Sequence, residues 1–378
     1  MHPLCRAVAL GACLLSSAFG QTAARELGTI SGHLYCADTQ TPCRFATVNV
    51  QSAPPIAKNP GTGQVDVLVR SYSTSTGLDG RFEIRGVEAG EYYILGRLAG
   101  YLSPYDLAAS ESGAGHSVPT QWLDKALGRI TVDAGQSVTV DLTLRRGASI
   151  EGTVLYDDGG FGVNIPIHLF RRDFNGKWAS YNAGVTDPDL APLGVGTHTD
   201  DRGRFYEAGL PPGFYVVEAT FPDSIVIPEK IVGAGSVNVN ITTGGALRVF
   251  SGDKYRLREA EIIELKEGEA RSDLTIDLPA HGLHVIRGAV VSKSGNRGIS
   301  GGTVSLLDPA DSTVLRETQI KEDGTFSFDS LTAGLYLVRI VSDGHDGGLR
   351  GGYESVTGQL LIENDMFNIT YTLSPKKN

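Results

Sequence analysis

One spaced pattern occurs three times along this chain of 378 residues and constrains its fold more than any other feature. The pattern reads Gly-x-Phe-x₃-(Gly/Ser)-(Val/Leu)-x₂-Gly-x-Tyr, and its copies begin at Gly80, Gly203 and Gly324. The copies lie about 120 residues apart, which is too long for a solenoid repeat and fits a domain repeated in tandem. The sequence therefore predicts three domains of one kind.

Strand signals surround each copy of the pattern. In each repeat, a β-like run with a glycine after its first apolar residue lies upstream of the pattern. A second run follows this first run, and an alternating run closes the repeat. Alternation at period two is typical of half-buried strands. The three sets of runs are 30–32, 46–50 and 138–144, then 150–152, 165–170 and 274–278, then 286–288, 302–307 and 367–373. With about seven short strands per copy, we expect an all-β protein of three tandem antiparallel sandwiches, immunoglobulin-like or transthyretin-like.

The repeated block also predicts local geometry. Each leading glycine follows Asp or Arg at a tight turn, where glycine accepts a positive φ. The final tyrosine of each copy resembles a tyrosine corner, with a buried ring and a hydroxyl bonded to nearby backbone. Copy two carries Glu207 where the other copies carry Ile84 and Phe328, so we expect that strand to twist or bulge there.

The repeats and their flanks divide the chain into four parts. Residues 1–20 are interpreted as a signal peptide cleaved before Gln21. An alternative is the lipoprotein-like Leu10-Gly11-Ala12-Cys13, with Cys13 lipidated. The sandwiches are expected at 27–144, at 145–279 with an insertion at 224–266 that adds strands, and at 280–375. A polar insertion in the first repeat holds one candidate short helix, residues 120–127.

Two cysteines remain after removal of the signal peptide, Cys36 and Cys43. An even pair in an exported chain predicts a disulfide, and Thr41-Pro42 between them suits a hairpin turn. A metal or redox pair is disfavoured because the spacing is not C-x-x-C.

The charge balance bears on partners. The chain has 33 basic and 43 acidic residues, a net charge of −10. Nucleic-acid binding normally needs a basic face, so no nucleic-acid partner is expected. No stretch after the signal peptide reaches the roughly 20 apolar residues of a transmembrane helix.

The middle repeat carries a family resemblance. The run Thr199–Phe205, followed by Gly209-Leu210-Pro211-Pro212-Gly213-x-Tyr215, resembles the carboxypeptidase regulatory-like domain. That resemblance implies a transthyretin-like (prealbumin-type) sandwich, found in tandem in exported bacterial proteins. Related starch-binding-like sandwiches are grouped with carbohydrate-binding folds, so the resemblance is specific for fold and weak for function.

No catalytic or metal-binding residues are predicted, and no cofactor. None of the eight histidines begins H-x-x-E or H-E-x-x-H, and His281 with His284 is interpreted as part of a solvated linker. No G-x-S-x-G run occurs. Glu218 is expected to point outward by alternation, which disfavours an isopeptide bond of the Cna-B type. Three aspartate groups are interpreted as turn-forming rather than calcium-binding, Asp157-Asp158, Asp200-Asp201 and Asp343 near Asp346.

Exposed aromatic residues are the candidate ligand-binding residues. Sugar rings stack on such platforms, and Trp178, Tyr181 and Trp122 lie in polar segments. The alternative is that these rings pack their loops onto the sandwich. We expect a non-catalytic exported protein that acts in binding, adhesion or as an envelope accessory, with a glycan or a cell-envelope protein as partner. Carbohydrate binding is the alternative, and a hydrolase accessory subunit or unrecognised hydrolase is a further one. The location would be periplasmic, outer-membrane-associated or extracellular.

Overall fold

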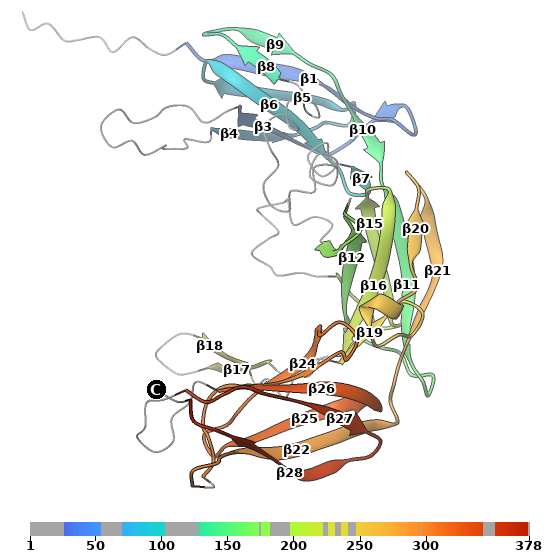
Figure 1. The fold of residues 1–378 in the computed structure, drawn as a ribbon. Helices are drawn as coiled ribbons and strands as arrows, with labels where there is room; N and C mark the ends of the chain where they lie inside the picture. Colours follow the sequence, from blue (N-terminus) through green and yellow to red (C-terminus); the bar gives the residue numbers. More distant parts are fainter. Residues whose placement is uncertain are drawn as a thin grey trace, which may run out of the picture.

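The chain folds into three tandem β-sandwiches (Figure 1). The computed structural model describes residues 26–53, 70–102, 127, 129–173, 175–181, 197–221, 226–230, 236–240, 247–295, 297–342 and 352–376. The interpreted signal peptide, Cys13 and all but the last residue of the candidate helix 120–127 lie outside these ranges. In the described ranges, no helix has the length and apolar character needed to cross a bilayer.

The first sandwich consists of two facing sheets around one core. One sheet contains β5 (Arg81–Val87), β1 (Gly28–Cys36), β9 (Ser137–Thr139) and β10 (Leu142–Arg146), with the short β2 (Thr41–Pro42) and β7 (Tyr101–Leu102). The other has the order β4 (Ser71–Ser75), β3 (Thr47–Ser52), β6 (Gly90–Arg97), β8 (Arg129–Val132). Ile30, Val48, Phe82 and Tyr92 are buried between them.

The second sandwich repeats this arrangement with additional strands. Its small sheet has the order β15 (Arg204–Leu210), β11 (Ala148–Tyr156), β21 (Ala270–Leu278). Its large sheet has the order β13 (Trp178–Tyr181), β12 (Pro166–Arg172), β16 (Gly213–Phe221), β19 (Leu247–Phe250). The short β14 (Thr197–His198) pairs with β12, and β20 (Ile263–Leu265) pairs with β16. The insertion contains the hairpin β17 (Val226–Lys230) and β18 (Ser236–Asn240), then β19, a 3₁₀ turn (Leu257–Glu259) and β20.

The third sandwich has the simplest form. Its small sheet has the order β25 (Thr325–Thr332), β22 (Leu283–Ser292), β28 (Met366–Leu373). Its large sheet has the order β24 (Val314–Gln319), β23 (Thr303–Leu307), β26 (Gly334–Val341), β27 (Val356–Ile362).

The sandwiches are mainly antiparallel, as predicted, but the sheet that holds the first strand of each sandwich also contains parallel pairs. In each sandwich the first strand pairs in parallel with the last, as β1 does with β9 and β10, β11 with β21, and β22 with β28. A parallel first and last strand means that the chain enters a sandwich at one end and leaves at the other. Successive sandwiches are therefore strung end to end (Figure 1).

The repeated pattern has the geometry predicted for it. The turn residues Gly80, Gly203 and Gly324 have φ values of 76°, 72° and 81°. Each corner tyrosine is buried and donates its hydroxyl hydrogen to the carbonyl four residues earlier. The three bonds are Tyr92 to Glu88 at 2.7 Å, Tyr215 to Pro211 at 2.6 Å and Tyr336 to Thr332 at 2.9 Å. Three tyrosine corners are thus confirmed.

Two separate sequence landmarks form one cross-strand contact. The glycine of each first strand lies directly opposite the phenylalanine of the pattern, as Gly32 lies opposite Phe82. A Cβ atom at Gly152 or Gly288 would lie 2.6 Å from a ring atom of the opposing phenylalanine. Glycine is required there because the aromatic ring and a backbone carbonyl of the closing strand segment together occupy the space of a side chain.

The sequence predicted a twist or a bulge at Glu207, but the bulge lies at another residue and has another cause. Glu207 pairs in register with Ile150, and the register shifts instead at Gly209. Gly86 marks a similar shift in the first sandwich, and both glycines are left-handed, with φ near 75°. The bulge therefore belongs to the pattern itself, whose Gly/Ser position supplies the left-handed residue.

Candidate functional site

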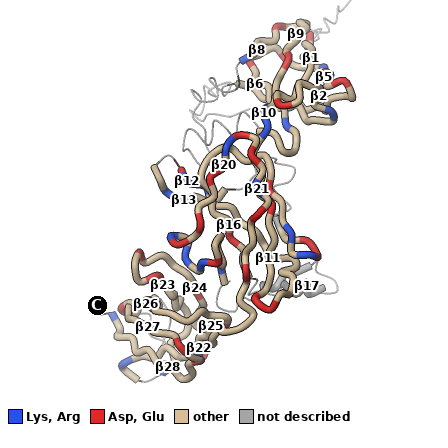
Figure 2. Tube along the Cα trace, turned by 90° about the vertical axis from the view of Figure 1, so that its right-hand side faces the viewer, with Lys and Arg blue, Asp and Glu red and all other residues tan. Residues whose placement is uncertain are grey.

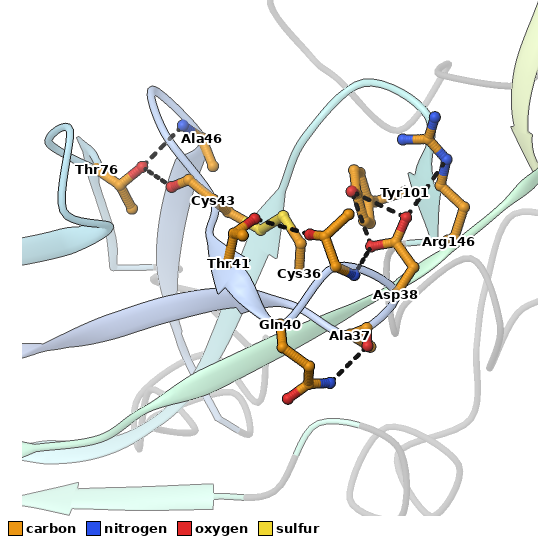
Figure 3. Close-up of a disulfide and its surroundings, with 11 residues drawn as sticks. Cys36, Ala37, Asp38, Gln40, Thr41, Cys43, Ala46, Thr76, Tyr101 and Arg146 are labelled. Atoms are coloured by element: carbon orange, nitrogen blue, oxygen red, sulfur yellow. Dashed lines mark hydrogen bonds and ion pairs between the residues drawn. A yellow bond between two sulfur atoms is a disulfide. The ribbon is translucent and has the colours of Figure 1, made fainter.

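The end of the first sandwich nearest the second is fixed by a disulfide (Figure 3). Cys36 and Cys43 are bonded, with their Cα atoms 5.5 Å apart, and both are buried. They close the hairpin of β1 and β2, in which Tyr35 pairs with Pro42. The predicted disulfide is confirmed, and it forms part of the first core.

Polar contacts tie this hairpin to the segment that enters the second sandwich. The hydroxyl of Tyr101 donates to Asp38 at 3.0 Å, and Arg146 lies 3.9 Å from the same carboxylate (Figure 3). The Arg146 guanidinium lies 4.9 Å from the Tyr101 ring centre. Burial, and then the hydrogen bond to Asp38, raise the pKa of Tyr101. Arg145 Nε donates a hydrogen bond to the Glu267 carboxylate of the second sandwich at 2.8 Å. Figure 2 shows charged residues of both signs where β10 approaches β20 and β21.

Beside the disulfide, two apolar side chains point into solvent. Phe45 is 70% exposed and Leu78 is 68% exposed. We call this pair the Phe45–Leu78 tip. Its two loops are joined by hydrogen bonds, because Phe45 N donates to Thr76 O at 3.2 Å and Arg44 Nε donates to Leu78 O at 2.9 Å.

The buried hydroxyl of Thr76 holds the base of the tip. It donates to Cys43 O at 2.6 Å and accepts from Ala46 N at 2.9 Å (Figure 3). The tip is therefore a fixed element supported by the disulfide two residues away.

Phe45 has an unusual backbone for its residue type, with a φ of 56°. In the second sandwich, the hydroxyl of Thr199 makes the same two hydrogen bonds as that of Thr76, and Asn164 N donates to Thr199 O as Phe45 N donates to Thr76 O. Asn164, also at φ 56°, is therefore the counterpart of Phe45. In the third sandwich, the bond from Ile320 N to Gly302 O identifies Gly301, at φ 80°. Asparagine and glycine tolerate this left-handed conformation, whereas it is an outlier for a bulky side chain.

Among the described residues, the two aromatic candidates from the sequence, Trp178 and Tyr181, do not form one platform. The Arg172 guanidinium lies 4.8 Å from the ring centre of Trp178. Tyr181 contacts the core tyrosine Tyr215 edge-on, with ring centres 5.9 Å apart. Trp178 and Tyr181 lie three positions apart in β13, an odd spacing, so their side chains point to opposite faces. Trp122 lies outside the described residues.

Glu218 lies on the outer side of its strand but is buried, contrary to the solvent-facing position expected. Arg248 Nε donates to it at 2.7 Å and Thr220 Oγ1 at 2.9 Å. The guanidinium in turn lies 5.7 Å from the Phe170 ring centre and 5.2 Å from that of Phe250. Alternation along β16 predicted the direction of Glu218, but the insertion strand β19 supplies the side chains that cover it.

The predicted linker histidines and turn aspartates have separate partners. His281 Nδ1 lies 3.1 Å from Asp157, and His284 Nδ1 lies 3.7 Å from Asp365. Asp200 accepts backbone hydrogen bonds at 2.8–2.9 Å within its turn. Asp343 and Asp346 lie outside the described residues. Across the described residues there is no group of three or more His, Cys, Asp or Glu placed to hold a metal ion.

A second ionic contact joins the second and third sandwiches. Asp308 is 3% exposed and lies 3.5 Å from Arg256 and 3.2 Å from Arg258. Arg256 also lies 5.0 Å from the ring centre of the corner tyrosine Tyr336. The aspartate, the two arginines and Glu259 line a cavity of about 340 Å³. Its two arginine charges are matched by its two carboxylate charges. Sequence reasoning missed this junction because Arg256 and Arg258 lie in the insertion, outside the repeated pattern.

Comparisons with known proteins are consistent with the fold. Residues 282–346 match the family model of the second β-sandwich domain of NOMO1-like BOS complex subunits. This match does not confirm the resemblance to the carboxypeptidase regulatory-like domain. No curated protein matches the chain.

Solved structures with similarity to the chain are distant. A streptococcal ancillary pilin is 11% identical, with 93% of this chain and 100% of that chain covered and a TM-score of 0.29. The major pilin subunit of Bacillus cereus is 10% identical, with the same coverage and a TM-score of 0.21. The Bacillus anthracis TIE protein is 13% identical, with 93% of this chain but 51% of that chain covered and a TM-score of 0.21.

Proposed function

We propose that this chain is a non-catalytic exported binding or adhesion protein, built from sandwiches of the carboxypeptidase regulatory-like type, that contacts a protein partner through the Phe45–Leu78 tip. The observation that carries the proposal is an exposed phenylalanine on a left-handed backbone, at a position where the other two sandwiches have asparagine and glycine.

Folding energetics do not account for Phe45. A left-handed backbone costs roughly 1–2 kcal/mol for a residue with a Cβ. At 70% exposure, Phe45 buries roughly 60 Å² of the 150–250 Å² that an aromatic side chain offers. That burial contributes about 1.5 kcal/mol at most. The cost of the left-handed backbone and the gain from burial nearly cancel. Phenylalanine at this position therefore does not stabilise the sandwich, and its role lies elsewhere.

The surroundings of the tip suit protein recognition. Rigid exposed aromatic residues and arginine are enriched at protein interfaces, and Arg44 lies between Cys43 and Phe45. Because the disulfide and Thr76 already fix the loop, binding would cost little further conformational entropy. A glycan partner through Trp178 receives no such support, since Arg172 lies against that ring.

Site-specific crosslinking tests the proposal. The photo-reactive residue p-benzoyl-phenylalanine replaces Phe45 in the full chain produced in its native cells, and replaces Phe161, which is 55% exposed, as the matched control. We expect a defined protein adduct from position 45 and none from position 161. The Phe45→Asn variant should then lose affinity for that protein while its unfolding curve stays within about 1 kcal/mol of wild type.

Two results would contradict the proposal. One is the absence of any adduct specific to position 45. The other is substrate turnover by the purified chain, which would refute the non-catalytic part even if the tip binds a protein.

A further inference from the structure

One arginine of the second sandwich is held between two aromatic rings. Arg172 is the last residue of β12, and its guanidinium lies 4.8 Å from the ring centre of Trp178 and 5.7 Å from that of Phe214. Trp178 is the direct partner of Arg172 on β13, and Phe214 lies on β16, the other neighbour of β12. Figure 2 shows β12 and β13 at the margin of the second sandwich. The cation thus contacts rings from the two strands that flank its own.

The guanidinium of Arg172 has unused hydrogen-bond donors. Its Nε is buried and has no hydrogen-bond partner, and no carboxylate of the described residues forms an ion pair with it. Asp173 instead accepts a hydrogen bond from Lys177 N at 2.8 Å. Glu264 lies on β20, opposite Phe214 and so two strands away from β12. Because a guanidinium carries five N–H donors, its free edge can bind an acceptor from outside the chain.

Other arginines that stack on rings show what such a cation binds. In the described ranges, four further arginines lie against aromatic rings, and each has a carboxylate partner. The pairs are Arg129 with Glu91 at 3.1 Å, Arg146 with Asp38 at 3.9 Å, Arg248 with Glu218 at 2.7 Å and Arg256 with Asp308 at 3.5 Å. Stacking occupies the faces of a guanidinium and leaves its in-plane N–H groups for a carboxylate. Arg172 has two rings around it but no acid from the described part of this chain.

The stack around Arg172 is a feature of the second sandwich and not of the repeat. The residue before the corner tyrosine is Glu91 in the first copy, Phe214 in the second and Leu335 in the third. In the first sandwich this residue is itself the acid that pairs with Arg129, an arginine stacked on a ring. In the second sandwich it is a phenylalanine that is 40% exposed. The second copy therefore has the cation and the rings of such a contact but takes no acid from this position.

We propose that Arg172, Trp178 and Phe214 bind the carboxylate of an acidic segment in a protein partner. Two N–H groups of the guanidinium donate to the two carboxylate oxygens, and the rings shield this pair from water. Tryptophan and arginine are among the residues most enriched at the energetic centres of protein interfaces. The chain has a net charge of −10, so the attraction acts at contact and not at long range. The proposal does not depend on the Phe45–Leu78 tip, which lies on the first sandwich.

The same geometry disfavours a neutral sugar as the ligand. A sugar ring would need an open aromatic face, whereas the guanidinium of Arg172 already lies against Trp178 and Phe214. A carboxylate uses the edge of the guanidinium and leaves the stack intact.

Binding of a labelled peptide to the full chain tests the proposal. The probe is a capped tetraglutamate peptide with a neutral dye, the control probe is the matching tetraglutamine peptide, and fluorescence anisotropy gives the dissociation constants. We expect the chain to bind the glutamate probe and not the glutamine probe. Arg172→Gln should weaken binding about tenfold or more, because hydrogen bonds to a charged group are lost. Arg172→Lys should weaken it less, since lysine keeps the charge but not the planar pair of donors.

Two controls separate this site from general charge attraction and from misfolding. Lys177→Gln removes an exposed positive charge beside Trp178 and should leave the affinity unchanged. Arg172→Gln removes no hydrogen bond among the described residues, so hydrogen exchange in β12 and β16 should match wild type. The chain has two tryptophans, so in a Trp122→Phe background the remaining indole N–H signal reports on Trp178 and should shift when the glutamate probe is added.

Several results would overturn the inference. They are the absence of binding, equal affinity for the two probes, unchanged affinity in Arg172→Gln, and an equal loss of affinity in Lys177→Gln. Tighter binding of oligogalacturonate than of the glutamate probe would also overturn it, because the site would then belong to an acidic sugar.

Discussion

The corner tyrosine of the middle sandwich offers the sharpest test of how the repeated pattern stabilises the fold. Tyr215 is fully buried, and its hydroxyl donates to Pro211 O at 2.6 Å. The Tyr215→Phe substitution keeps the ring in the core and removes only the oxygen. Any loss of stability therefore comes from the hydrogen bond and not from packing.

The expected loss follows from the burial of both groups. A net hydrogen bond contributes about 1 kcal/mol, and leaving a buried carbonyl unpaired costs about 1–3 kcal/mol. We expect Tyr215→Phe to lower the free energy of unfolding of the second sandwich by about 2 kcal/mol. Tyr215→Ala also empties the ring site and should cost about 3–5 kcal/mol.

Hydrogen exchange by mass spectrometry reads each sandwich separately, which is necessary because three cores do not unfold as one two-state unit. Exchange should accelerate in β15 and β16 and stay unchanged in β5, β6, β25 and β26. Tyr92→Phe and Tyr336→Phe serve as matched variants, each acting on its own sandwich. A change below about 0.5 kcal/mol, or one spread evenly over all three sandwiches, would refute the reasoning.

Two further predictions concern the disulfide and a turn aspartate. Replacing Cys36 and Cys43 together by alanine opens a short loop with a sequence separation of 7, and should destabilise the first sandwich by about 2–3 kcal/mol in chemical denaturation, leaving the other two unchanged. Backbone N–H groups of Arg204 and Arg202 lower the pKa of Asp200 in the folded state, so the stability it contributes is present above about pH 4 and is lost as the pH falls through the lowered value. The melting temperature of Asp200→Asn should therefore lie below wild type at pH 7, and the difference should disappear near pH 2; an equal difference at both pH values would show that the carboxylate charge is not the cause.

Features set by local spacing were predictable from the sequence. The turn glycines, the tyrosine corners and the disulfide hairpin each depend on residues close together in the chain, and spacing alone restricts how such residues can meet. The threefold recurrence of one pattern then made a tandem sandwich fold the simplest interpretation.

The candidate site was less predictable. Phe45 has no sequence signal of its own, since one aromatic residue after Cys43-Arg44 is ordinary. Its left-handed φ becomes informative only when Asn164 and Gly301 are recognised as its counterparts, and that correspondence comes from hydrogen bonds and not from the pattern.

The sequence by itself determined three sandwiches, their turns and their corner tyrosines, because these rest on short-range geometry repeated three times. The tertiary structure alone decided which strands became neighbours. It placed the first and last strands of each sandwich in parallel, buried Glu218 beneath Arg248 and set Arg172 against Trp178. Contacts of that kind join residues distant in the chain, and their cost or benefit depends on neighbours that no local pattern specifies.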